Sequence, residues 1–161
     1  GLVANGLADP NKVVIRGGSA GGYAVLNGLV HSKVFAAGAN YYGVAELIML
    51  AEDTHDFESR YLDSLIGPYP EQKELYIERS PLTHADNLTS PLIIFQGSDD
   101  PIVPPSQSQA FRDACIKNGV KYKYFEFEGE SHGFRKSQTI TTCAIEELKF
   151  FGEVLGFVPA D

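Results

Sequence analysis

Short β-branched segments alternate along this chain with stretches whose apolar residues recur at helical spacing. Strands buried in a parallel sheet read as nearly continuous apolar runs, and helical crossovers usually connect them. The alternation therefore predicts an α/β fold with a mostly parallel sheet and helices on both faces. We expect strands at residues 12–16, 35–42, 91–96 and 121–127, and helices at residues 23–30, from about 106 to 119, and from about 137 to 155.

Two of the predicted helices carry more detailed expectations. Residues 106–109 (Ser-Gln-Ser-Gln) match a capping box, which places the start of one helix at Ser106. Cys115 and Cys143 fall within the two apolar stripes, which favours free buried thiols over a disulfide and is typical of a reducing cytoplasm. In the final helix, the side chains expected to face the core recur at spacings of three or four residues: Ile140, Ala144, Leu148, Phe151 and Leu155.

The 161 residues, 43% of them hydrophobic, suffice for one core but not for two ordinary domains. We therefore expect a single domain over residues 1–161. Between residues 44 and 90 the regular pattern gives way to short amphipathic pieces, interrupted by Gly-Pro-Tyr-Pro at residues 67–70. This stretch is predicted to be a lid-like insertion over the sheet.

The charge and hydropathy of the chain argue against several classes of partner. A formal net charge of −8 argues against binding to nucleic acid or to anionic lipids. No run of 18 apolar residues and no signal-peptide pattern occurs, which predicts a soluble, cytoplasmic protein that does not insert into membranes. Residues 52–58 are rich in possible metal ligands but lack any metal-binding spacing, so we expect neither a metal nor an organic cofactor.

The most informative motif is Gly-Gly-Ser-Ala-Gly at residues 17–21, which lies between a predicted strand and a predicted helix. This G-x-S-x-G pattern is typical of a nucleophile elbow, a strained turn that exposes the serine hydroxyl while glycines allow close backbone approach. Ser19 is therefore a candidate nucleophile, and the backbone N–H of Ala20 a candidate donor to an oxyanion. The alternative is a glycine-rich turn with an idle serine.

A serine nucleophile requires a base and a carboxylate that orients the base. Asp100 follows the third predicted strand and His132 follows the fourth, in the chain order serine, acid, histidine that this elbow uses. Asp99 is a competing acid, which we interpret as a turn residue. The predicted catalytic triad is Ser19, Asp100 and His132.

These motifs together resemble the catalytic domain of the prolyl oligopeptidase family of serine peptidases, which includes dipeptidyl and acylaminoacyl peptidases. The resemblance implies the α/β-hydrolase fold. In the family pattern D-x-x-V-P the aspartate is the acid, which falls here on Asp100. The resemblance is carried by four segments in order: residues 17–22 (GGSAGG), 79–82 (RSPL), 96–105 (QGSDDPIVPP) and 129–134 (GESHGF).

The resemblance also identifies candidate substrate-binding residues. Val103 matches a residue that lines the pocket for the side chain before the scissile bond. Ile102 stands where well-known family members carry Arg or Asn, and an alkyl group cannot donate a hydrogen bond to a substrate carbonyl. Tyr41 and Tyr42 end the second predicted strand, where aromatic residues either line a pocket or pack in a core.

The motif lies near the start of the sequence, whereas in the family several strands, a second oxyanion donor and a propeller precede it. We therefore expect this chain to be the C-terminal part of a longer polypeptide that self-associates when isolated. The expected function is that of a serine hydrolase that cleaves peptide or small acyl substrates through an acyl-enzyme, as a peptidase. The alternatives are a carboxylesterase with the same triad and an inactive fragment that keeps only the fold.

Overall fold

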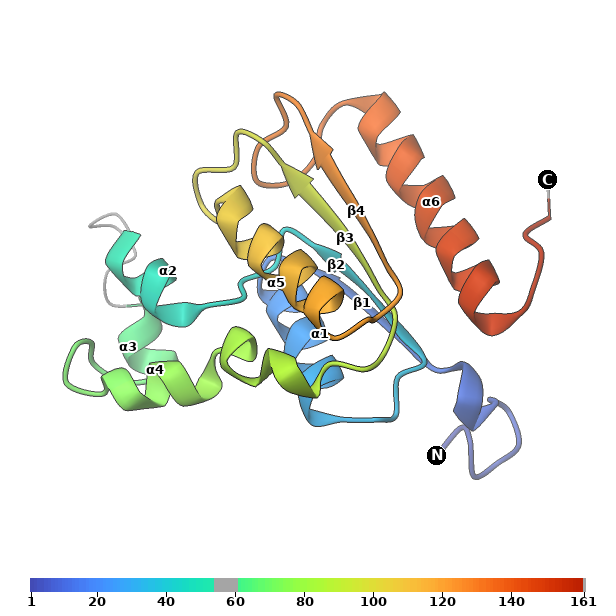
Figure 1. Ribbon diagram of the computed structural model, residues 1–161, viewed down its shortest axis with the longest axis horizontal. Coiled ribbons are helices and arrows are strands. Elements are labelled where there is room, and N and C mark those ends of the chain that lie inside the picture. Colours follow the sequence, from blue (N-terminus) through green and yellow to red (C-terminus); the bar gives the residue numbers. More distant parts are fainter. Residues whose placement is uncertain (54–60, 161) are drawn as a thin grey trace.

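The computed structural model describes residues 1–53 and 61–160 of the chain (Figure 1). Its sheet is parallel and has the strand order β1-β2-β3-β4. Each strand lies within two residues of its predicted bounds. The strands are β1 (Val14–Gly18), β2 (Ala37–Tyr41), β3 (Leu92–Gly97) and β4 (Tyr122–Phe127).

Helices connect the strands in sequence. Two short 3-10 helices, η1 (Pro10–Lys12) and η2 (Pro81–Asn87), precede β1 and β3. The α-helices are α1 (Ala20–His31), α2 (Leu47–Asp53), α3 (Tyr61–Leu65), α4 (Lys73–Arg79), α5 (Pro105–Lys117) and α6 (Ser137–Leu155).

The strand register brings the carboxyl ends of all four strands to one edge of the sheet. Gly18 pairs with Tyr41, and Tyr41 in turn pairs with Phe95. Gly97, at the end of β3, pairs with Phe127, at the end of β4. The loops that follow these strands are therefore neighbours in space, although they lie far apart in the sequence.

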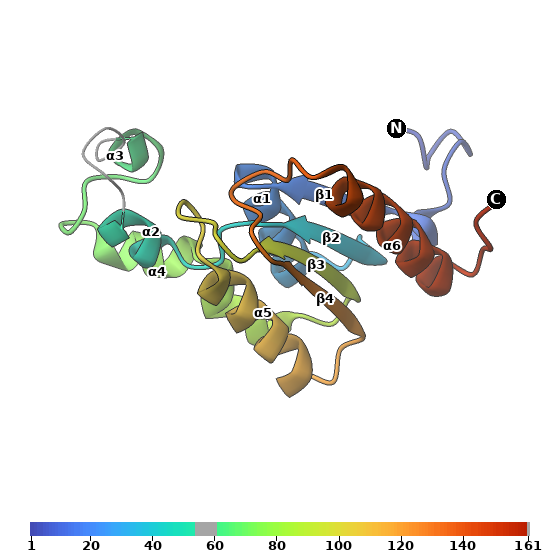
Figure 2. The same cartoon turned by 90° about the horizontal axis from the view of Figure 1, so that it is seen from above.

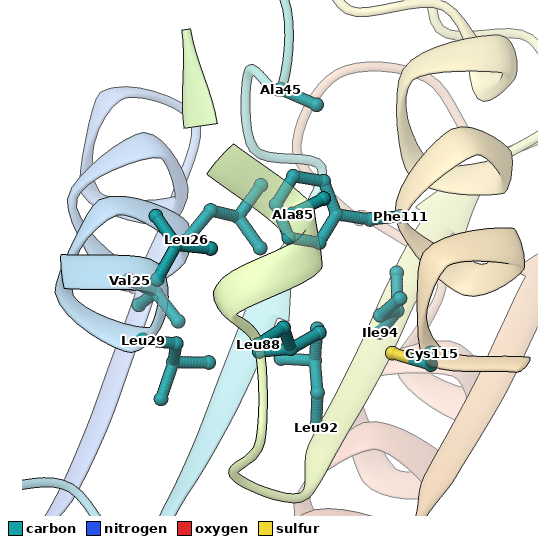
Figure 3. Close-up of a cluster of buried hydrophobic side chains, with 11 residues drawn as sticks. Val25, Leu26, Leu29, Ala45, Ala85, Leu88, Leu92, Ile94, Phe111 and Cys115 are labelled. Carbon is teal, nitrogen blue, oxygen red and sulfur yellow. The ribbon is translucent and has the colours of Figure 1, made fainter. Parts of the chain in front are cut away.

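Helices cover both faces of the sheet, as predicted: α1 and α5 pack on one face and α6 on the other (Figure 2). The core under α1 and α5 is drawn in Figure 3 and includes Val25, Leu26, Leu29, Leu88, Leu92, Ile94, Phe111 and Cys115. The core under α6 includes Ala37, Ala39, Ile93, Phe95, Cys143, Phe150 and Phe151. The two cysteines are buried in different cores and are free, which confirms their interpretation as unpaired thiols.

The capping-box prediction for α5 is wrong. The helix begins at Pro105, its N-cap is Pro104, and no side chain caps it. Proline in the first helical turn has a backbone angle already suited to the helix and lacks an N–H that would need a partner. The helix therefore begins before Ser106, whose hydroxyl instead contacts the sulfur of Met49 at 3.8 Å.

The predicted inward face of α6 is partly wrong. Phe151 is buried and Leu155 packs against the core, but Ile140, Ala144 and Leu148 are exposed. The buried face instead runs through Thr139, Cys143, Phe150 and Phe151. Apolar residues occupy two adjacent stripes of this helix, and periodicity cannot tell which stripe contacts β2 and β3.

The stretch predicted as an insertion forms α2 to α4 and η2, and α2 to α4 lie beyond the carboxyl end of the sheet (Figure 2). Within this stretch, residues 54–60 lie outside the described residues. The helices share a buried cluster with the loop after β3, formed by Val44, Leu47, Leu62, Tyr76 and Val103. The insertion thus adjoins that loop, while its role as a lid stays a prediction.

None of the helices in the described part of the chain is long and apolar enough to cross a membrane.

Candidate active site

Ser19 lies on the turn between β1, which ends at Gly18, and α1, which begins at Ala20. Its backbone has φ 55° and ψ −118°, a region that residues with a side chain rarely adopt. The backbone N–H of Ser19 donates to the carbonyl of Tyr41 at 3.0 Å, which ties the strained turn to β2. The turn therefore has the strained strand-to-helix geometry expected of a nucleophile elbow.

Glycine is required on both sides of this turn, but not at every position of the motif. A Cβ on Gly17 would lie 2.4 Å from the carbonyl oxygen of Gly21, and a Cβ on Gly22 would lie 2.5 Å from the side chain of Asn40. Gly21 has open space where its Cβ would be. Close packing of α1 against β1 and β2 thus depends on Gly17 and Gly22.

The structure brings Ser19, His132 and Asp100 into one hydrogen-bonded chain. Ser19 Oγ lies 2.8 Å from His132 Nε2. On the other side of the ring, His132 Nδ1 lies 2.8 Å from Asp100 Oδ2. The three residues come from the loops after β1, β3 and β4, which the sheet register places side by side.

Asp100 is held by its own loop. Its Oδ1 accepts hydrogen bonds from the backbone N–H groups of Ile102 and Val103, both at 2.9 Å, while its Oδ2 faces His132. The side chain is fully buried. Asp99, by contrast, is exposed and accepts from the hydroxyl of Ser98 at 2.6 Å.

Tyr42 packs against the candidate base, a contact that sequence reasoning missed. Its ring centroid lies 4.9 Å from that of His132 and 5.1 Å from that of Phe134, in edge-to-face geometry. Tyr42 also has a positive φ of 40°, and a Cβ on Gly18 would lie within 3.2 Å of its ring. Burial, aided by the charge of Asp100, raises the pKa of the Tyr42 phenol. The phenol therefore stays neutral and supports the imidazole by packing.

A cavity of about 290 Å³ lies between β1, β2 and α6. Beside it, Glu147 accepts a hydrogen bond from the Tyr41 hydroxyl at 2.6 Å and pairs with Arg16 at 2.9 Å. Burial raises the pKa of the Cys143 thiol to about 12, so the thiol is neutral at ordinary pH. The cavity is lined by Arg16, Tyr41, Tyr42, Phe134, Ile140, Cys143 and Ala144.

The structure also describes the other predicted site residues. Ala20 is exposed at the first position of α1, and Ile102 is also exposed. The Val103 side chain is buried against the insertion, and Tyr42 lines the cavity just described. Within the described residues, no group of three or more acidic, histidine or cysteine side chains is arranged to hold a metal ion. Most of the acidic run at residues 52–58 lies outside them.

A parallel sheet with helices on both faces and a serine on a tight strand-to-helix turn defines the α/β-hydrolase fold, and solved structures of peptidases share it. The sequence pattern of the prolyl oligopeptidase family matches residues 1–157. The chain belongs to the prolyl oligopeptidase family.

The relatives of this chain include peptidases and esterases. A structure of a puromycin-hydrolyzing peptidase from Mycobacterium tuberculosis is 49% identical, with a TM-score of 0.95, over 99% of this chain and 24% of that one. Dipeptidyl aminopeptidase BIII from Pseudoxanthomonas mexicana is 32% identical over 96% of this chain and 23% of its own length. Esterase LipQ from M. tuberculosis is 28% identical over 92% of this chain and 39% of its own length. The chain thus spans about a quarter of the length of the peptidases, and the matches support a hydrolase.

Proposed function

We propose that this chain carries the catalytic centre of a serine peptidase that cleaves peptide or acyl bonds through an acyl-enzyme. The observation that carries the proposal is the continuous hydrogen-bonded chain from Ser19 through His132 to Asp100, with 2.8 Å at each step. An activated serine nucleophile requires this arrangement of nucleophile, base and orienting carboxylate.

In the proposed first half-reaction, Ser19 Oγ attacks the substrate carbonyl carbon while His132 Nε2 accepts the hydroxyl proton. Asp100 holds Nδ1–H and stabilises the imidazolium that forms. The carbonyl electron pair moves onto oxygen, where the backbone N–H of Ala20 donates a hydrogen bond. The intermediate then collapses, the bond to the leaving group breaks, and His132 returns the proton to that group.

In the proposed second half-reaction, a water molecule attacks the ester carbon of the acyl-enzyme while His132 Nε2 takes its proton. Collapse of this second intermediate breaks the bond to Ser19 Oγ, which regains its proton from His132. The products are a carboxylic acid and a free enzyme. No metal or organic cofactor takes part in any proposed step.

Two observations bear on the proposed substrate class: the identity of the relatives and the side chain of Ile102. Peptidases named above share up to 49% identity with this chain, against 28% for the esterase, which favours cleavage of amide bonds. A carboxylesterase is the second candidate, because the exposed alkyl side chain of Ile102 has no hydrogen-bond donor for a substrate carbonyl. An inactive chain that keeps only the fold is the third.

The test compares two chromogenic substrates that carry the same acyl group, an aminoacyl amide and the corresponding ester, on the whole protein. Esters are intrinsically more reactive, so the informative quantity is the ratio of amide to ester kcat/KM. A peptidase should cleave both, and Ser19→Ala should abolish both activities together. Turnover of the ester alone would favour the carboxylesterase, and turnover of neither would favour the inactive chain.

A further inference from the structure

A second buried carboxylate lies two residues before the candidate base. Glu130 is only 2% exposed, yet it lies in the loop that carries His132. A buried charge is costly unless hydrogen bonds satisfy it, so its partners reveal what it does. The proposed reaction assigns Glu130 no chemical role.

The Glu130 side chain closes the His132 loop on itself. One carboxylate oxygen accepts from the backbone N–H of Arg135 and the other from that of Lys136, both at 3.0 Å. Burial alone would raise the pKa of this carboxyl, but these hydrogen bonds, together with that of the Thr139 hydroxyl, lower it below its ordinary value. Glu130 is therefore an anion at neutral pH, and both of its oxygens act as acceptors.

The backbone of Glu130 ties the same loop to the loop of the acid. Its carbonyl accepts from the N–H of Asp99 at 3.0 Å, next to Asp100. The packing there is tight, because a Cβ on Gly97 would lie 2.3 Å from the Glu130 carbonyl oxygen. Glu130 therefore fixes both ends of the loop that carries His132. Its carbonyl holds one end to Asp99, and its carboxylate holds the other end to Arg135 and Lys136.

We propose that Glu130 is a positioning residue that sets the distance from His132 to both Ser19 and Asp100. The proposal rests on the proposed function for its catalytic consequence, but the positioning itself is independent of turnover. A neutral amide in place of the carboxylate would present an NH₂ group to one of the two backbone N–H donors. One end of the loop would then be released, and misplacement of a catalytic group by about 1 Å can cost on the order of 10² in rate.

The control is a second buried side chain that accepts hydrogen bonds from two successive backbone N–H groups. Gln107 is buried on α5, and its Oε1 accepts from the successive N–H groups of Ala45 and Glu46 at 2.8 and 2.7 Å. It serves a loop that carries no triad residue. Gln107→Ala therefore shows how the loss of hydrogen bonds to two backbone N–H groups changes stability when no residue of the proposed triad is involved.

The experiment measures kcat, KM and the proton NMR signal of His132 Nδ1–H in the whole protein, for Glu130→Gln and for Gln107→Ala. Glu130→Gln should lower kcat by up to about 10²-fold with little change in KM, and should shift or broaden the Nδ1–H signal. Gln107→Ala should lower the melting temperature and leave the signal unchanged. Thr139→Val, a milder change that removes only the threonine hydroxyl from the carboxylate, should shift the signal in the same direction.

An unchanged Nδ1–H signal in folded Glu130→Gln and Thr139→Val proteins would overturn the proposal. So would equal changes in Glu130→Gln and Gln107→Ala, because the effect would then be one of general stability. If Ser19 proves unreactive, the signal still reports on the Glu130 clamp, so failure of the proposed function and failure of this inference remain distinguishable.

Discussion

At the scale of single residues, two adjacent aspartates in one loop have different surroundings. Asp100 is buried between two backbone N–H groups and the imidazole of His132, whereas Asp99 is exposed and contacts Ser98. A carboxylate that orients a catalytic histidine must be fixed in place and must face its Nδ1. Only Asp100 meets both conditions.

Replacing each aspartate by asparagine should separate their roles. Asp100→Asn should lower turnover by about 10⁴, by analogy with the loss that follows when a triad histidine is held in the wrong tautomer. Asp99→Asn should change turnover little, because its side chain does not contact His132. Steady-state kinetics on both variants provides the measurement, and the opposite ranking would reassign the acid.

The proximity of Ser19, Asp100 and His132 could be predicted because each lies in a short motif after a strand, and strand ends in a parallel sheet meet at one edge. The contact between Tyr42 and His132 could not, because it depends on a positive φ at a tyrosine, for which the sequence gives no signal. Glu130 lies two residues before His132 in the sequence, but its burial depends on how the loop folds so that the carboxylate meets the backbone N–H groups of Arg135 and Lys136.

At the scale of elements, the strands and long helices could be predicted to within a few residues because periodicity and flanking turns mark them. The orientation of α6 could not. Ile140, Ala144 and Leu148 recur every four residues, as core residues do, but they are exposed and do not belong to the core under this helix. Together they form an exposed stripe that borders, through Ile140 and Ala144, the same cavity as Arg16 on the edge strand β1.

We propose that the 161-residue chain, expressed by itself, pairs with a second copy through β1 and this stripe, since exposed apolar edges promote association. The double substitution Ile140→Lys, Leu148→Lys should shift the chain from dimer to monomer in sedimentation velocity. Ile116→Lys, on an exposed site of α5, is the matched control and should leave the mass unchanged. A monomer before any substitution would refute the proposed pairing.

At the scale of the whole molecule, this chain spans about a quarter of the length of the related peptidases, yet it contains Ser19, His132 and Asp100 in one hydrogen-bonded chain. The parallel sheet explains how so short a chain can bring these three residues together. The loops after β1, β3 and β4 end at the same edge of the sheet, and these three loops are enough to bring Ser19, Asp100 and His132 together. The sequence of this chain could not predict the substrate, because one fold serves many different reactions.

The proposed function requires Ser19 to be a nucleophile that His132 activates. The most direct test labels the whole protein with a fluorophosphonate and locates the adduct by peptide mass mapping. We expect one adduct, on the peptide that contains Ser19, with none in Ser19→Ala and much slower labelling in His132→Ala, since only an activated serine reacts at a useful rate. An adduct on a different residue, or undiminished labelling of Ser19→Ala, would contradict it.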